Sequence, residues 1–130
     1  MGYGKLKLDL TYSANADYTP DELPDIAALT FTASKHLVLK NLSLSATDLT
    51  IDLGMFTTVK YVIVVNTGTT NECYVTWNST DVSGAAVTSQ DHNVPTESLI
   101  VLPGVTIAAD LILDCATSET TTADVYVLGT

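Results

Sequence analysis

Apolar and polar side chains alternate with a period of two residues along most of this chain. Leu6, Leu8 and Leu10 share one phase near the start, and apolar residues occupy every second position from Val105 to Cys115. No segment repeats its apolar residues with the 3.6-residue period of an amphipathic helix. Because successive side chains of a strand point to opposite faces, the alternation predicts strands with one face toward a core. The pattern therefore indicates an all-β fold.

The number of strands narrows the fold class further. We expect about eight strands joined by short turns, which is typical of an antiparallel β-sandwich, and we predict the jelly-roll type. The composition agrees, because 30 of the 130 residues are Thr or Ser and β-branched residues suit a half-buried sheet. An immunoglobulin sandwich is the alternative, but the order and spacing of Cys73 and Trp77 do not fit it.

Two interruptions of the pattern are informative. Apolar residues occupy odd positions before Lys40-Asn41 and even positions after it, and this slip predicts a β-bulge or a crossing between sheets. Val59 to Val65 is the most apolar run, which we interpret as a central strand covered on both faces. Turn-forming residues follow from Asn66 to Asn71, and Cys73 to Trp77 alternates again. We therefore predict a β-hairpin from these two strands.

The first 25 residues differ from the rest of the chain. A starting strand leads into an acidic, proline-bounded loop from Ser13 to Pro24. Within this loop, Thr19-Pro20-Asp21-Glu22 has the cap, first-turn proline and early acids of a helix start, which Pro24 limits to about one turn. We predict an N-terminal strand, or arm, with its acidic loop over residues 1–25 and a β-sandwich domain over residues 26–130.

Charge limits the partners that the chain can bind. It has 15 acidic residues against five basic ones, a formal net charge of −10, and all five basic residues are lysine. Proteins that neutralise phosphates need a basic patch, commonly with arginine, so we expect no nucleic acid partner. The same electrostatics disfavour an anionic membrane surface. No apolar run approaches the roughly 18 residues of a membrane helix, so we also expect no membrane partner.

Residue types that carry catalysis are sparse. His36 and His92 are the only histidines, and we expect His92 in a surface loop and His36 at an exposed strand entry. Asp110 and Asp114 share a strand phase, but four residues along a strand span about 13 Å, too far for a glycosidase pair. The Ser13 to Asp25 loop has oxygen ligands enough for calcium but lacks the spacing of a calcium loop. We predict no enzymatic activity, no catalytic residue, no cofactor and no metal.

Cysteine and tryptophan are expected in the core. Cys73 and Cys115 fit no zinc or redox spacing, and each lies in an apolar strand-like run. We expect two buried free thiols; a bridge between neighbouring strands is the alternative, because both share the phase of core residues. Trp77 shares its phase with Val75, which favours core packing. A carbohydrate-binding or adhesin-like β-sandwich module, with Trp77 and Tyr18 as its ligand platform, is the alternative function that we retain.

Features of the chain from Ala28 onward carry a resemblance. They are short alternating strands, the Pro103-Gly104-Val105 turn before a long apolar strand, and a final strand from Asp124 to Gly129. In these features the chain resembles the small jelly-roll virion structural proteins of tailed bacteriophages. The resemblance implies a non-enzymatic protein of the virion that decorates or cements the capsid or builds tail or fibre parts, commonly as a homotrimer.

On this resemblance, the expected partners are other virion proteins, of the capsid or the tail, and copies of the chain itself. The arm would reach a neighbour, and we predict that Lys5, Lys7, Tyr12 and Tyr18 take part in assembly. If the lysines meet acids of another copy or of a partner, assembly should weaken as salt screens these charges.

Overall fold

The computed structural model describes residues 3–6, 11–12, 21–22, 29–77, 90–103 and 111–130. Every regular element within these ranges is a β-strand. The described residues include no helix, and hence no helix long and apolar enough to cross a membrane. All the strand pairs are antiparallel. The all-β prediction is confirmed.

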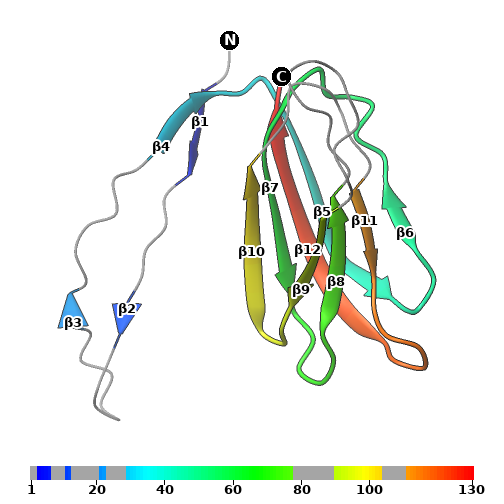
Figure 1. Cartoon of the computed structure of the whole chain (residues 1–130). Helices are drawn as coiled ribbons and strands as arrows, with labels where there is room; N and C mark the ends of the chain where they lie inside the picture. The colour runs from blue at the N-terminus through cyan, green and yellow to red at the C-terminus, as the bar shows by residue number, and fades with distance from the viewer. Residues whose placement is uncertain (1–2, 7–10, 13–20, 23–28, 78–89, 104–110) are drawn as a thin grey trace.

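Eight strands form two four-stranded sheets, which we call sheet I and sheet II (Figure 1). Sheet I has the order β10-β7-β12-β5, and sheet II has the order β6-β11-β8-β9. This arrangement confirms an antiparallel β-sandwich, whereas the jelly-roll type stays a prediction. The strands of sheet I are β10 (Ser98–Pro103), β7 (Val59–Asn66), β12 (Thr121–Gly129) and β5 (Lys35–Leu44), and those of sheet II are β6 (Leu49–Ile51), β11 (Leu111–Asp114), β8 (Cys73–Trp77) and β9 (Gln90–Val94).

The core lies between the two sheets, and strand alternation supplies it. In β12 and β8, buried residues occupy every second position along the strand. Removing these apolar side chains from water stabilises the fold by about 25 cal/mol for each Å² buried. Trp77 is only 5% exposed, and Cys73 and Cys115 are buried free thiols. Core packing of Trp77 and the free state of both cysteines are therefore confirmed.

The predicted hairpin of β7 and β8 is wrong. β7 pairs with β10 and β12 in sheet I, whereas β8 pairs with β11 and β9 in sheet II. The chain passes between sheets after Asn66, whose buried side-chain amide donates to the carbonyls of Asn71 and Val94, both at 3.0 Å. A residue that we interpreted as part of a turn joins the two sheets.

The phase slip in β5 is a β-bulge, as predicted. Two residues of β5, Lys40 and Asn41, lie opposite the single residue Asp124 of β12. Asn41 has a φ of 55°, and its backbone N–H donates to Asp124 Oδ1 at 2.8 Å. Asparagine adopts the left-handed region more readily than most residues, which explains why the bulge forms at this position.

β7 has a central position in sheet I, but only one of its faces is covered. Val62 and Val64 are fully buried against sheet II. Tyr61, Ile63 and Val65 point the other way and are half-buried. The expectation of a strand covered on both faces is wrong for the single chain, because no third layer of described residues lies outside sheet I.

The N-terminal part of the chain contributes two short ladders outside the four-stranded sheets (Figure 1). The segment joins the sandwich at the start of β5, where the Ser34 N–H donates to the Gly129 carbonyl at 2.9 Å. The division into residues 1–25 and 26–130 stays a prediction. The ladders pair β1 (Tyr3–Leu6) with β4 (Leu29–Thr32) and β2 (Thr11–Tyr12) with β3 (Asp21–Glu22).

The predicted helical turn is wrong at Asp21 and Glu22. These two residues form β3 and pair with β2, so their backbone is extended. Thr19 and Pro20 lie outside the described residues. Tertiary pairing outweighs the helix-start signal here, since a signal that Pro24 limits to about one turn adds few hydrogen bonds for the residues it fixes.

Candidate functional site

The outer face of sheet I is apolar across all four strands. Because side chains alternate, the residues between the buried positions of each strand point away from sheet II. The register aligns them in rows, one of which runs through Val101, Ile63, Tyr126 and Val38. We define the apolar face as Val38, Tyr61, Ile63, Val65, Leu99, Val101, Tyr126 and Leu128.

The side chains of the apolar face remain accessible to solvent. Leu99 is 49% exposed and Val38 is 47% exposed, and the other six are half-buried. Among the described side chains, Met55 in the loop after β6 is the other large apolar one that is strongly exposed, at 46%. A contiguous apolar patch of this kind marks an interaction surface in a soluble protein.

Lys40 and Asp124 lie beside the apolar face at the β5 bulge. The side chains of both interact with other residues of sheet I. Lys40 Nζ lies 6.0 Å from the centroid of the Tyr126 ring, a cation–π distance. The carboxylate of Asp124 accepts the Asn41 N–H of the bulge. With one positive and one negative group, this border carries no net charge.

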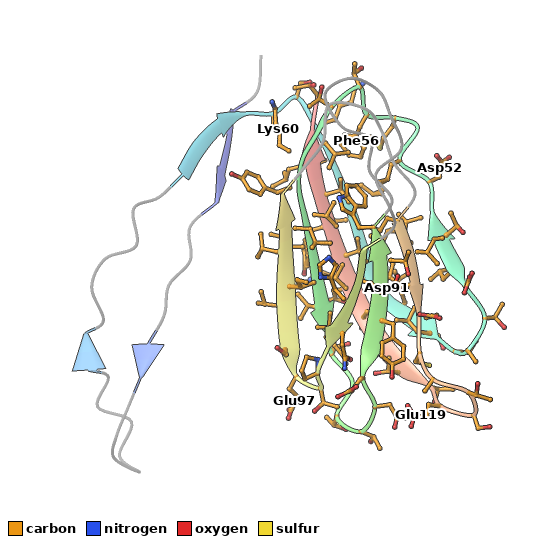
Figure 2. The ribbon with its side chains drawn as sticks, in the orientation of Figure 1. Asp52, Phe56, Lys60, Asp91, Glu97 and Glu119 are labelled. Carbon is orange, nitrogen blue, oxygen red and sulfur yellow. The ribbon has the colours of Figure 1, made fainter. Side chains whose placement is uncertain are left out.

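The two ends of sheet I carry opposite charges. Lys35 and Lys60 lie where β5 and β7 begin, and Lys35 Nζ donates to the Met55 carbonyl at 2.6 Å. Glu97 precedes β10, which runs antiparallel to β7 and so begins at the opposite end of the sheet. Figure 2 shows Lys60 and Glu97 at these two ends.

The outer face of sheet II is polar and acidic. Thr76 Oγ1 donates to Asp91 Oδ1 at 3.0 Å, and Asn93 Nδ2 donates to Glu72 Oε2 at 2.7 Å. The described lysine side chains all belong to sheet I, so none compensates these acids. The acids of sheet II and its flanks are Asp48, Asp52, Glu72, Asp91 and Asp114.

Partial burial and neighbouring acids both act on the carboxyl group of Asp114. Its partial burial raises the pKa of the carboxyl group, and the negative charges of Asp48 and Asp91 raise it further. Within the described residues, no group of three or more His, Cys, Asp or Glu side chains is placed to hold a metal ion. Without a bound cation, the acids of sheet II repel one another and other anionic groups.

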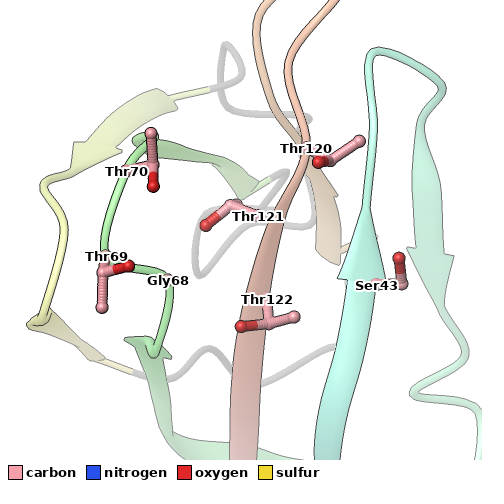
Figure 3. Close-up of a pocket in the computed structure, with 7 residues that line it drawn as sticks. All are labelled: Ser43, Gly68, Thr69, Thr70, Thr120, Thr121 and Thr122. Atoms are coloured by element: carbon pink, nitrogen blue, oxygen red, sulfur yellow. The ribbon is translucent and has the colours of Figure 1, made fainter.

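A pocket of about 220 Å³ opens where the β7–β8 and β11–β12 connections meet (Figure 3). Hydroxyl groups dominate its lining, which includes neither a charged nor an aromatic side chain. Such a lining can form hydrogen bonds but supplies no acid, no base and no stacking surface. The lining residues are Ser43, Gly68, Thr69, Thr70, Thr120, Thr121 and Thr122.

A polar network around Asn66 and Asn71 adjoins the residues that line this pocket. Asn66 Oδ1 accepts the Gly68 N–H and the Thr121 hydroxyl, both at 3.0 Å. Asn71 Nδ2 donates to the Thr120 carbonyl at 2.9 Å. A side chain at position 68 would collide with Thr121 Oγ1, so glycine allows the two connections to approach closely. The network positions the pocket and ties the two sheets together.

The side chains of all four residues predicted for assembly lie outside the described side chains. Lys5 lies in β1 and Tyr12 lies in β2, whereas Lys7 and Tyr18 lie outside the described residues. Their role in assembly stays a prediction. Trp77 faces the core, and its burial leaves little of the indole for a ligand platform.

The histidines lie on strands. His36 is exposed in β5, as expected for a strand entry. His92 lies in β9 opposite Val75, so the surface-loop expectation for it is wrong. Its side chain is half-buried, and Nε2 is buried with no hydrogen-bond partner among the described residues. Asp110 lies outside the described residues.

Sequence reasoning missed the apolar face, although its signal was visible. The run from Tyr61 to Val65 lacks the polar alternation that a strand with one wet face shows. We interpreted this as coverage by the chain itself. The same signal arises when a second molecule provides the cover.

Comparisons of this chain with protein-family models, with curated proteins and with solved structures gave no match.

Proposed function

We propose that this chain is a non-enzymatic virion structural protein of a tailed bacteriophage. It acts through protein–protein assembly, as a capsid decoration or cement protein or as a tail-associated protein. The observation that supports this proposal is the apolar face, a broad sheet surface contributed by four strands. Burying such a face against another protein is favourable by about 25 cal/mol for each Å² removed from water. The apolar face is suited to assembly because its side chains include few groups that need solvent.

The N-terminal ladders support the same proposal. A two-stranded ladder on its own is marginally stable in water, since few of its side chains leave solvent. The β1–β4 and β2–β3 ladders lie outside the four-stranded sheets and would gain stability against a neighbouring molecule (Figure 1). The partners in this proposal are other virion proteins and copies of the chain, for which the resemblance implies a trimer.

The test is the composition of purified particles. Mass spectrometry of virions from the phage that encodes the chain should detect it at a fixed ratio to the major capsid or tail protein. A chain that is abundant in the infected lysate but absent from purified particles would overturn the proposal. Deletion of residues 1–25 should leave a folded β-domain that no longer joins particles, and normal incorporation of the truncated chain would rule out the arm as the attachment element.

The pocket favours a second candidate, a carbohydrate-binding or adhesin-like module. Its threonine hydroxyls could bond the hydroxyl groups of a sugar. A glycan array tests this directly: reproducible binding that Thr120→Val or Tyr18→Ala abolishes would support it. Trp77→Ala is a poor probe, because Trp77 is buried in the core. An array without a reproducible signal would exclude this candidate for the glycans it displays.

A further inference from the structure

We propose that the apolar face is a self-association surface on which two copies of the chain pack sheet I against sheet I. The two copies are related by a two-fold axis that lies in the interface and runs perpendicular to the strands. This inference goes beyond the proposed virion function and is separate from the trimer that the resemblance implies for the particle, because it names one contact between two isolated chains in solution.

The size of the face sets the expected strength of the contact. Four strands about 4.8 Å apart, with about seven residues rising 3.4 Å each, cover about 450 Å² per copy. Two copies would bury roughly 900 Å², which is below the 1,200–2,000 Å² of a standard stable interface. An interface of this size is typical of a weak, transient contact, so we expect a reversible dimer with a dissociation constant in the micromolar range.

The charge distribution favours a second copy on this face. The chain carries a net charge of −10, so two copies repel each other over most of their surfaces. Sheet I holds the described lysine side chains and the neutral bulge border, whereas the acids crowd the outer face of sheet II. Packing sheet I on sheet I keeps both acidic faces outward and as far apart as the sandwich allows. Packing sheet I on sheet II of another copy would instead bury Asp91 and Asp114 against apolar side chains, which is costly.

The charges at the two ends of sheet I select the orientation. A two-fold axis perpendicular to the strands places the Lys60 end of each copy over the Glu97 end of the other. The row through Ile63 lies between these ends along the strands, so the axis passes near the middle of the apolar face. A two-fold axis parallel to the strands would instead place like charges together.

One of the two edges of sheet I, strand β5, discourages the competing strand-to-strand contact. β5 is an edge strand, and it carries Lys35, Lys40 and the bulge at Asn41. Charged residues and bulges on an edge strand hinder its extension by another chain. Strand pairing at the β5 edge is therefore disfavoured, and the test must separate face packing from pairing at β10, the other edge of the sheet.

The test is the self-association of the full chain, measured by sedimentation equilibrium from low micromolar to millimolar concentration. The wild-type chain should form a dimer with a micromolar dissociation constant. Leu99→Glu and Val38→Glu each place a negative charge on the face and should raise that constant at least about tenfold. Thr50→Glu is the charge control, because Thr50 is also exposed but lies in β6 of sheet II, away from the lysine end of sheet I, and it should leave the constant unchanged. Circular dichroism and thermal melts verify that each variant folds.

A charge exchange tests the orientation. Glu97→Lys should weaken the dimer, and the double variant Glu97→Lys, Lys60→Glu should restore part of the loss. A wild-type chain that stays monomeric to millimolar concentration would overturn the proposal. So would a trimer, or a dimer that Leu99→Glu and Val38→Glu leave intact, and these results would leave the particle test of the virion function untouched. Failure of the exchange to restore the dimer would overturn the perpendicular axis.

Discussion

Sheet I and sheet II present alternate residues to a shared core, but their outer faces have opposite character. The outer face of sheet I is apolar and is bordered by lysines, whereas five acids occupy sheet II and its flanks. Both sheets have the same strand alternation on their inner faces. The core therefore specifies the sandwich, and the outer faces can differ without changing it.

The two outer faces therefore affect stability and association in different ways. Sheet II keeps its acids in water, where repulsion between them costs a little stability and hinders contacts with other acidic copies. Sheet I leaves apolar area exposed, which the chain can bury only against another molecule.

The largest effect is expected at Asn66, which links the two sheets. Asn66→Ala removes four hydrogen bonds and leaves the Val94 carbonyl and the Gly68 N–H without this partner. We expect the free energy of unfolding in urea to fall by about 3 kcal/mol. Asn93→Ala is the control, since its exposed amide bonds only Glu72 on sheet II, and it should cost about 0.5 kcal/mol. Equal losses in the two variants would show that the sheets do not depend on Asn66.

The second prediction concerns the inner face of sheet II at alkaline pH. Burial raises the pKa of the Cys73 thiol to about 12, with smaller contributions from Asp114 and Cys115. A raised pKa favours the protonated thiol in the folded state, so this stability is complete below the ordinary pKa of 9.0 and is lost as pH rises toward 12. At pH 11 the loss should be about 2 to 3 kcal/mol.

Cys73→Val isolates this effect, because valine is similar in size and does not ionise. Urea unfolding of the variant between pH 8 and pH 11 should show a smaller decrease in stability than the wild type. A thiol reagent should label Cys73 in the wild type at pH 8 only as fast as the fold opens. Immediate labelling of the native protein, or identical pH profiles, would contradict the burial argument.

Asp124 and Asp114 lie on the outer faces of sheet I and sheet II. Replacing each by alanine should change stability differently, by less than the loss expected for Asn66→Ala. Asp124→Ala on sheet I removes the acceptor of the Asn41 N–H at the bulge and should destabilise the fold by about 1 kcal/mol. Asp114→Ala on sheet II removes a carboxylate that is partly buried and that Asp48 and Asp91 repel, so this substitution should be neutral or stabilising at pH 7. Because the pKa of Asp114 is raised, the wild type should approach this variant in stability as pH falls and Asp114 protonates. If both substitutions lowered the free energy of unfolding at pH 7, the proposed difference between the two outer faces would be wrong.

The sequence identified the elements that depend on local pattern. Period two predicted the strands and their inward residues, and the slip at Lys40-Asn41 located the bulge, because a bulge must reverse the phase. The inward phase of Cys73 and Cys115 likewise predicted two buried thiols. These features follow from the chain's own alternation, whichever strands become neighbours.

The wrong predictions concern strand pairing and the cover of outer faces, which the alternation of side chains does not specify. Period two says which face a residue occupies but not which strand lies beside it, so β7 and β8 looked like a hairpin while each pairs in its own sheet. Asn66 resembled a turn residue because its burial depends on carbonyls of Asn71 and Val94, which only the fold brings near. The run from Tyr61 to Val65 showed that a second face needs cover, without showing which molecule supplies it. The candidate surface therefore required the assembled sheet.

The smallest expected effect is the response of folding stability to salt. Raising sodium chloride from about 0.02 to about 0.5 M shortens the screening length several-fold and weakens repulsion among the acids of sheet II. The free energy of unfolding of the dilute wild-type chain should rise by less than about 1 kcal/mol. The double variant Asp91→Asn, Asp114→Asn should lose part of this gain, whereas Glu97→Gln at the end of sheet I should retain it. Equal salt dependence in both variants would show that the repulsion is spread over the whole chain, and sheet II would then differ from sheet I in composition but not in its electrostatic effect on the fold.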